Sequence, residues 1–220
     1  MPLNRTSQFV ILALLSIFAS NALAQGASAR RPHRRRDITI SNQWAFTTVV
    51  DGYFTPGEDG YADPIVTADH NWLHLEARYN YEDLRTGSVW LGYNFNYTSD
   101  KKLDLTLTPM IGGVFGRTTG ISPGSEASLT YKKLNLWVSE QYVFDTRDRS
   151  GSYFYTWPQL TYTPVDWLRV GLVAQRTQAA QSSTQGGFLV GLTHKKVDFT
   201  SYILDPGPKP TVVLELGYSF

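Results

Sequence analysis

The side chains of this sequence that could do acid–base or metal chemistry are few. The chain has four histidines: His33, His70, His74 and His194. Asp69-His70, close in sequence to His74 and Glu76, could form a general base or part of a metal site. However, Asp69-His70 falls at a predicted turn, and no further ligand occurs at a suitable spacing. We therefore interpret these histidines as hydrogen-bonded or solvated, and predict no catalytic, metal-binding or cofactor-binding residue.

Other chemistries lack their residues or motifs. The chain contains no cysteine, which excludes thiolate catalysis, disulfides and cysteine-ligated metals. It has no glycine loop of the kind that cradles phosphates. Five arginines lie together just before Asp37: Arg30, Arg31, Arg34, Arg35 and Arg36. Such a run could touch anionic lipid head groups or nucleic acid, but nothing aromatic accompanies it, so we expect no nucleic-acid partner.

The amino terminus predicts export. An apolar run from Phe9 to Ala19 is followed by Ala22-Leu23-Ala24, which together predict a signal peptide over residues 1–24, cleaved before Gln25. The run is too short for a spanning helix, which needs roughly 20 apolar residues. We interpret residues 25–37 as a basic, disordered periplasmic leader and residues 38–220 as one domain. The full chain has 20 basic and 19 acidic residues; six of the arginines precede Asp37, so 14 basic residues remain against 19 acidic ones.

That domain has the period of β-strands. In the stretch from Trp72 to Glu82, apolar residues such as Leu73 and Leu75 alternate with polar ones such as His74 and Glu76. Most of the segments have about 9–13 residues, near the 9–11 that a tilted membrane-spanning strand needs. The twelve predicted segments are 42–54, 63–69, 72–82, 88–98, 103–116, 125–132, 134–145, 152–163, 167–177, 186–195, 197–205 and 211–220.

The links between these segments alternate between longer loops and short turns. Outer-membrane barrels have long outer loops, short periplasmic turns and both termini in the periplasm, which requires an even number of strands. We therefore predict an all-β fold, a transmembrane antiparallel up-and-down β-barrel of twelve strands, with ten strands as the alternative. Aromatic residues near the strand ends are expected to form the interfacial girdles: Tyr81, Tyr93, Tyr97, Trp137, Tyr142, Tyr153, Tyr155, Trp157, Tyr162, Trp167 and Tyr218.

If the apolar faces point outward, the polar faces line the lumen. The predicted lumen-lining residues are His74, Glu76, Arg78, Asn80, Glu82, Asp104, Glu126, Lys132, Arg169, Gln175, Asp198 and Glu215. Glu140 does not fit, because it shares the apolar face of its strand. A β-bulge, or a position above the membrane core, would explain it.

Two stretches resemble bacterial outer-membrane proteins. The last strand, Thr211 to Phe220, resembles the carboxyl-terminal strand of outer-membrane β-barrels, in which it is the signal read by the barrel-insertion machinery. The resemblance implies that Tyr218 and Phe220 act as an assembly signal. The stretch from Leu73 to Asp83, together with Pro109 to Gly116, is similar to an uncharacterised group of such barrels, which implies location and fold but no activity.

The predicted function is a passive narrow pore in the bacterial outer membrane, with a mixed-charge, mildly acidic lumen for small solutes or ions. A lumen closed by its own charges, as in a purely structural barrel, explains the same residues equally well. A lipid-modifying hydrolase of the phospholipase or lipid A deacylase type is suggested by strand count alone. The expected partners are outer-membrane lipid, lipopolysaccharide and the insertion machinery, and the expected state is a monomer or weak oligomer.

Overall fold

A computed structural model describes residues 43–99, 102–179 and 182–220. The predicted signal peptide, the basic leader and residues 38–42 lie outside the described residues. The described chain forms β-strands and one short 3₁₀ turn, η1 (Arg149–Gly151). No helix within it is long and apolar enough to cross a membrane. The strands are β1 (Ala45–Phe54), β2 (Tyr61–His70), β3 (Leu73–Tyr79), β4 (Thr86–Tyr93), β5 (Phe95–Ser99), β6 (Leu103–Gly116), β7 (Gly120–Tyr131), β8 (Leu134–Asp145), β9 (Tyr153–Val165), β10 (Leu168–Gln178), β11 (Ser182–His194), β12 (Val197–Leu204) and β13 (Thr211–Ser219).

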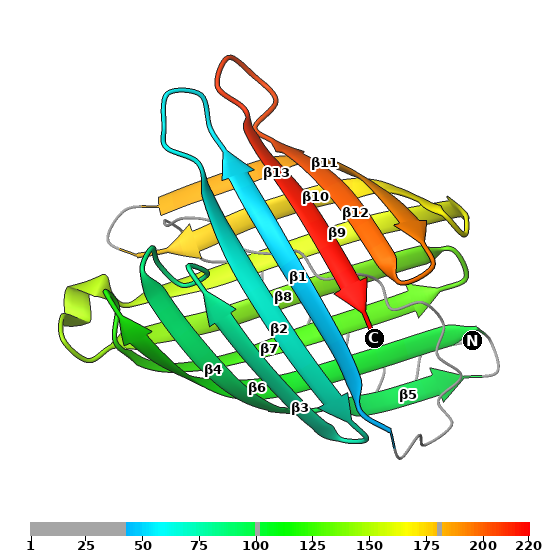
Figure 1. Cartoon of the computed structure of the whole chain (residues 1–220), viewed down its shortest axis with the longest axis horizontal. Helices are drawn as coiled ribbons and strands as arrows, with labels where there is room; N and C mark the ends of the chain where they lie inside the picture. Colours follow the sequence, from blue (N-terminus) through cyan, green and yellow to red (C-terminus); the bar gives the residue numbers. More distant parts are fainter. Residues whose placement is uncertain (1–42, 100–101, 180–181) are drawn as a thin grey trace, which may run out of the picture.

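These elements make a closed barrel of twelve antiparallel strands (Figure 1). β4 and β5 are one barrel strand interrupted at Asn94, because both pair with β6 in the same register. Every other strand pairs with its neighbours in sequence, and β1 pairs with β13 to close the sheet. The predicted count of twelve is confirmed, and the alternative of ten is wrong.

The strand boundaries differ most where glycine and proline suggested loops. β2 begins at Tyr61 rather than residue 63, and β7 begins at Gly120 rather than residue 125. Pro123 lies on the outer face of β7, where the strand continues through it. Asp69 and His70, expected in a turn, are the last residues of β2, and the turn follows at residues 71–72.

The two ends of the barrel differ, as predicted. One end has the tight turns at 71–72, 132–133, 166–167 and 195–196, and the other has the loops at 55–60, 80–85, 146–152 and 205–210. Asn71, Lys132 and Lys195 open their turns with positive φ values of 53°, 57° and 53°. We call these the turn end and the loop end.

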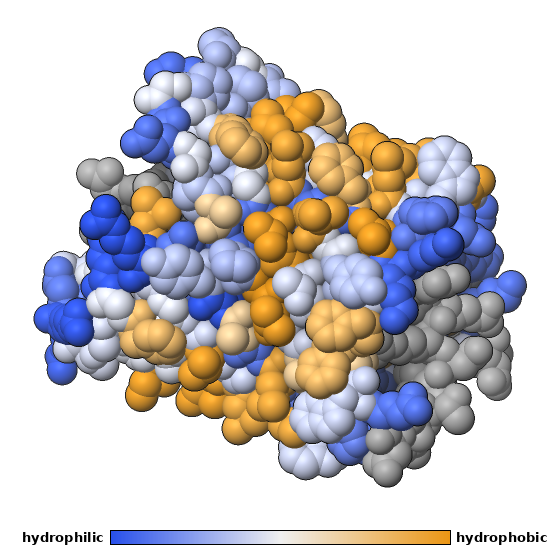
Figure 2. Space-filling model, viewed as in Figure 1, coloured by the Kyte–Doolittle hydropathy of each residue, from blue (hydrophilic) through white to orange (hydrophobic). Residues whose placement is uncertain are grey.

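The outer face of the barrel is apolar and the inner face is largely polar. Figure 2 shows apolar side chains gathered over the wall formed by β1–β4, β12 and β13. Exposed aromatic side chains encircle the turn end, as an interfacial girdle does. They are Trp44, Phe46, Trp72, Tyr93, Phe95, Tyr97, Tyr131, Tyr162, Trp167, Tyr218 and Phe220. A band of this kind matches a lipid bilayer rather than water.

Part of the predicted girdle instead lies inside the barrel. Tyr81, Trp137, Tyr153, Tyr155 and Trp157 are buried in the interior cluster. The physical reason is the alternation along β9, where Tyr153, Tyr155 and Trp157 share the inward face with polar residues while the even-numbered residues face out. Position near a strand end was therefore the wrong criterion for these five.

The last residue completes the seam between β1 and β13. Phe220 and Phe46 exchange two backbone hydrogen bonds, of 3.0 and 3.1 Å, beyond the end of the strand ladder. Their rings stack with centroids 5.6 Å apart. The pairing of the final strand with the first leaves no open edge at this seam.

Candidate functional site: the charged lumen

The inward faces of the strands bring most of the predicted lumen residues into the barrel. Eight of them are buried: His74, Glu76, Arg78, Glu82, Arg169, Gln175, Asp198 and Glu215. Asp104 and Glu126 are half-buried on the inward faces of β6 and β7. Glu82 reaches the interior from the loop that joins β3 to β4 rather than from a strand.

Two predicted lumen residues lie elsewhere. Asn80 has a positive φ of 64° and stabilises the loop after β3, since its side chain bonds the Ala62 carbonyl and the Arg85 amide. Lys132 belongs to the turn between β7 and β8, where its ammonium lies 5.0 Å from the centre of the Tyr131 ring. Both were misplaced because strict alternation was extended past the ends of the strands.

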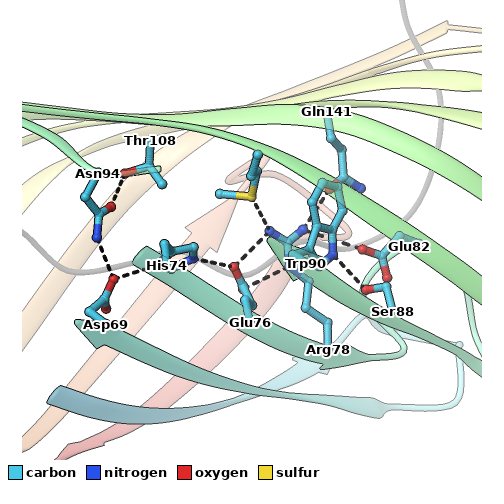
Figure 3. Close-up of polar contacts among 11 residues, drawn as sticks. Asp69, His74, Glu76, Arg78, Glu82, Ser88, Trp90, Asn94, Thr108 and Gln141 are labelled. Carbon is cyan, nitrogen blue, oxygen red and sulfur yellow. Dashed lines mark hydrogen bonds and ion pairs between the residues drawn. The ribbon is translucent and has the colours of Figure 1, made fainter. Parts of the chain in front are cut away.

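A line of hydrogen-bonded polar side chains follows β3 through the lumen (Figure 3). At the turn end, His74 has one ring nitrogen 2.7 Å from Asp69 and the other 3.3 Å from Glu76. Asn94, at the interruption between β4 and β5, donates to Asp69 at 2.8 Å. Thr108 on β6 donates to Asn94 at 2.7 Å. The break between β4 and β5 therefore points the side-chain amide of Asn94 toward the polar side chains that follow β3.

Arg78 is the centre of this line. Its Nε donates to Glu76 at 2.9 Å, and Nη1 lies 3.5 Å from Glu82. The guanidinium carbon lies 4.2 Å from the centre of the Tyr81 ring and 4.3 Å from that of Trp90. This geometry combines two carboxylate partners with stacking on two aromatic faces, which suits a planar guanidinium.

Trp90 can lie flat under Arg78 because its neighbour on β6 has no side chain. Gly112 is the register partner of Trp90, and a Cβ built there would lie 2.5 Å from the indole ring. The adjacent Gly113 faces the outside, and a Cβ built there meets nothing within 4 Å. Gly112 is thus a functional position that the sequence analysis missed.

Contacts cross the lumen from one wall to another. Arg78 Nη1 donates to the side-chain oxygen Oε1 of Gln141 on β8 at 2.7 Å, although β4, β6 and β7 lie between β3 and β8. Tyr81 meets Tyr155 of β9 edge to face with ring centroids 6.1 Å apart. Tyr153 of β9 donates to the Glu82 carbonyl. We call these three contacts the cross-lumen bridge; they narrow the lumen toward the loop end.

Glu82 belongs to this bridge but lies outside the strands. Burial raises the pKa of the Glu82 carboxyl, and the Arg78 guanidinium acts in the opposite direction. Because burial is the larger effect, the neutral form of Glu82 is favoured relative to a solvated glutamate.

A second charged cluster is formed by β10, β12 and β13. Arg169 donates to both oxygens of Asp198, at 3.0 and 3.3 Å, and to Thr200 at 2.6 Å. Tyr202 donates to Glu215 at 2.9 Å. Gly191 of β11 is the register partner of Arg169, and a Cβ there would lie 2.8 Å from the guanidinium. This cluster keeps its arginine flat against the wall.

Three carboxyl groups lie side by side next to that cluster. Asp51 of β1 is the register partner of both Asp63 of β2 and Glu215 of β13, and all three are 0% exposed. Cβ atoms of directly opposite residues are about 4.5–5.5 Å apart. Carboxyl groups at this spacing repel one another when more than one is ionised, so a shared proton or a nearby cation stabilises the row. We call Asp51, Asp63 and Glu215 the acidic row; only Glu215 of the three was predicted.

Among the buried side chains of the described residues, carboxyl groups outnumber guanidinium groups. The buried carboxyl groups are Asp51, Asp63, Glu76, Glu82, Asp198 and Glu215, and the buried guanidinium groups are Arg78 and Arg169. Among the described residues, no group of three or more histidine, aspartate or glutamate side chains is arranged to hold a metal ion.

Comparison with known proteins identifies the fold. No protein-family model matches the sequence, and no curated protein matches it. Among solved structures, a KdgM porin superposes with a TM-score of 0.57 at 9% identity, covering 79% of this chain and 99% of that one. A KdgM porin in complex with disordered oligogalacturonate gives 0.56 at 8% identity, with the same coverage. The chain therefore has the barrel fold of these porins.

Proposed function

We propose that the chain is a narrow outer-membrane pore that favours small cations and neutral solutes. Two features support a location in the outer membrane: the barrel has the fold of porins, and its outer face carries an apolar band. The observation that supports cation selectivity is the acidic row, in which three inward carboxyl groups lie on adjacent strands. With these three included, six buried carboxyl groups face two buried arginines in the described lumen. A negative lining concentrates cations by Coulomb attraction and repels anions.

The lining also argues against an acidic oligosaccharide as substrate. One of the similar porins was solved with oligogalacturonate, a polyanion. The buried arginines of this chain, Arg78 and Arg169, are already engaged by Glu76 and Asp198. A polyanion would therefore meet excess negative charge here, and small cations are the better fit.

The test is the reversal potential in a salt gradient across a planar bilayer. Wild-type protein should give a reversal potential of the sign expected for a cation-preferring pore. The variant Asp51→Asn/Glu215→Gln should move it toward zero, because two carboxyl groups of the acidic row are lost. Asp59→Asn, in an exposed outer loop, is the matched control and should not move it. An anion-preferring wild type would overturn the proposal.

A closed structural barrel is the second candidate, and the cross-lumen bridge favours it. Arg78, Tyr81 and Tyr155 join opposite walls, so the bridge could stop solute passage altogether. In that case wild-type protein would not conduct, whereas a variant without the bridge would. The lipid-modifying hydrolase has no such support: Ser125, on the outer face, bonds Glu140 rather than a histidine.

A further inference from the structure

Four exposed arginines lie on three neighbouring loops at the loop end of the barrel. Arg85 is in the loop that joins β3 to β4, Arg117 is in the loop that joins β6 to β7, and Arg147 and Arg149 are in the loop that joins β8 to β9. These strands are consecutive around the barrel, so the loops lie next to one another. They are on the left of Figure 1, where η1 is drawn as a coil, and Figure 2 shows hydrophilic side chains at the same edge.

Backbone contacts hold the three loops in one arrangement. The Arg117 amide donates to the Arg85 carbonyl at 3.3 Å, and the Thr146 amide donates to the Thr119 carbonyl at 2.9 Å. Gly116 makes the first approach possible, because its φ is +126° and a Cβ there would lie 2.4 Å from the Arg85 carbonyl oxygen. The positions of the arginines on this surface are therefore fixed by the backbone of the loops.

Arg85 and Arg147 lie on either side of one peptide unit. The carbonyl of Arg85 is bonded by the amide of Arg117, and Arg147 Nη1 donates to the carbonyl of the preceding residue, Gly116, at 2.9 Å. A guanidinium group has five N–H donors in a fixed fork. Arg147 therefore keeps donors for a further partner while this bond holds its side chain over the loops.

The aspartates of the same loops are engaged in holding the loops together. Asp145 accepts two backbone amides of its own loop, at 2.8 and 3.1 Å, and Asp148 accepts one at 3.0 Å. Asp83 pairs with Arg117 at 3.3 Å. Arg117 therefore already has a carboxylate partner, and the other three arginines carry the exposed positive charge of this surface. We call Arg85, Arg147 and Arg149 the loop-end arginines.

An apolar wall lies directly below these loops on the outer face of the barrel. Phe115 of β6, Ile121 of β7 and Phe144 of β8 are each more than half exposed. Each is one residue from the loop end of its strand. Positive charge immediately above an apolar, lipid-facing wall matches an amphipathic anion, whose charge lies at the membrane surface and whose hydrocarbon chains lie below it.

We propose that the loop-end arginines bind the phosphate groups of lipopolysaccharide, whose acyl chains lie against the apolar wall below. A planar guanidinium binds a phosphate through two parallel N–H donors. The other described loops of this end offer less: the loop at 55–60 carries Glu58 and Asp59, and the loop at 205–210 carries one aspartate and one lysine. The proposal rests on the outer-membrane location proposed above, with the loop end facing outward, and it does not require a conducting lumen.

The first test is binding of a short-chain lipopolysaccharide to folded protein in detergent, measured by native mass spectrometry. A chelator keeps divalent cations from bridging the phosphates. Arg85→Gln/Arg147→Gln should raise the dissociation constant about tenfold or more, because hydrogen bonds to charged groups are lost. Lys195→Gln/Lys196→Gln removes the same charge from an exposed turn at the other end and should not change it. Heat-modifiable migration in gels shows that each variant is a folded barrel. Equal losses of affinity in the two variants, or no loss in either, would overturn the proposal.

The second test changes the ligand instead of the protein. Lipopolysaccharide without its lipid A phosphates should bind wild-type protein about tenfold more weakly than the phosphorylated form, and Arg85→Gln/Arg147→Gln should no longer distinguish the two. Equal binding of both forms by wild-type protein would refute phosphate recognition. Oligogalacturonate that displaces lipopolysaccharide from the arginines would assign them to a soluble polyanion and would also refute the proposal. Neither measurement needs an open lumen, so failure of the pore and failure of this site are seen separately.

Discussion

Removing Arg78 should destabilise the barrel far more than removing a surface arginine. Arg78→Ala deletes the ion pair to Glu76, the hydrogen bond to Gln141 and the stacking on Trp90. Breaking a buried ion pair from one side costs about 3–5 kcal/mol, because the remaining charge stays buried without its counter-ion. Arg117→Ala is the matched control: Arg117 pairs with Asp83 at 3.3 Å but is 65% exposed, so its loss should cost under about 1 kcal/mol.

The double variant Arg78→Ala/Glu76→Gln separates the charge effect from the packing effect. It removes both members of the pair, so it should cost less than the sum of the two single variants by about 1–3 kcal/mol. The assay is reversible urea unfolding of protein refolded into phospholipid vesicles, followed by tryptophan fluorescence. An Arg78→Ala cost no larger than that of Arg117→Ala, or strict additivity of the pair, would refute the assigned role of Arg78.

Three further predictions concern single positions. Gly112→Ala should cost about 1–3 kcal/mol by displacing Trp90, whereas the neighbouring Gly113→Ala should be nearly neutral, as the same unfolding assay would show. Deleting Phe220 should lower the fraction inserted into membranes, measured by heat-modifiable migration, before it alters pore properties, because its backbone bonds close the seam. Because burial raises the pKa of Glu82, its contribution to stability is present at low pH and lost as pH rises through the raised value. Glu82→Gln should flatten that pH dependence, and an unchanged slope would contradict it.

The barrel could be predicted because the membrane imposes strong rules on the sequence. Alternation in β3 places Leu73 and Leu75 outward and His74 and Glu76 inward, and the same period recurs in strand after strand. Closure without an open edge then requires an even count with both termini at one end. The length of each strand, the two-residue alternation along it and the even number of strands can all be read from the sequence without knowing which residues meet in space.

The lumen residues were predicted wrongly, or missed, where the alternation of apolar and polar residues along the strand no longer shows which way a side chain points. Asn80 and Lys132 lie just past strand ends, where a turn reverses the direction of the side chain. Asp51 and Asp63 were overlooked because the inward faces of β1 and β2 mix them with Val49, Tyr53 and Ile65. An inward face that contains aliphatic and aromatic residues lacks the clean polar alternation on which the prediction relied.

The contacts across the lumen could not be predicted at all. Arg78 and Gln141 are 63 residues apart, and their meeting depends on the stagger accumulated over the strands between them. The same holds on the outer face, where only the register places Glu140 and Arg176 on either side of Thr156. Sequence period gives the face of a residue, whereas its neighbours on that face come from the register.

Single-channel recording of wild-type protein and Arg78→Ala tests the pore most directly. Purified, refolded wild-type barrels should show discrete conductance steps in a planar bilayer. Arg78→Ala should enlarge those steps because it opens the cross-lumen bridge, while Arg117→Ala should leave them unchanged. If neither wild-type protein nor Arg78→Ala produces discrete steps, although both migrate as folded barrels, the chain is not a pore.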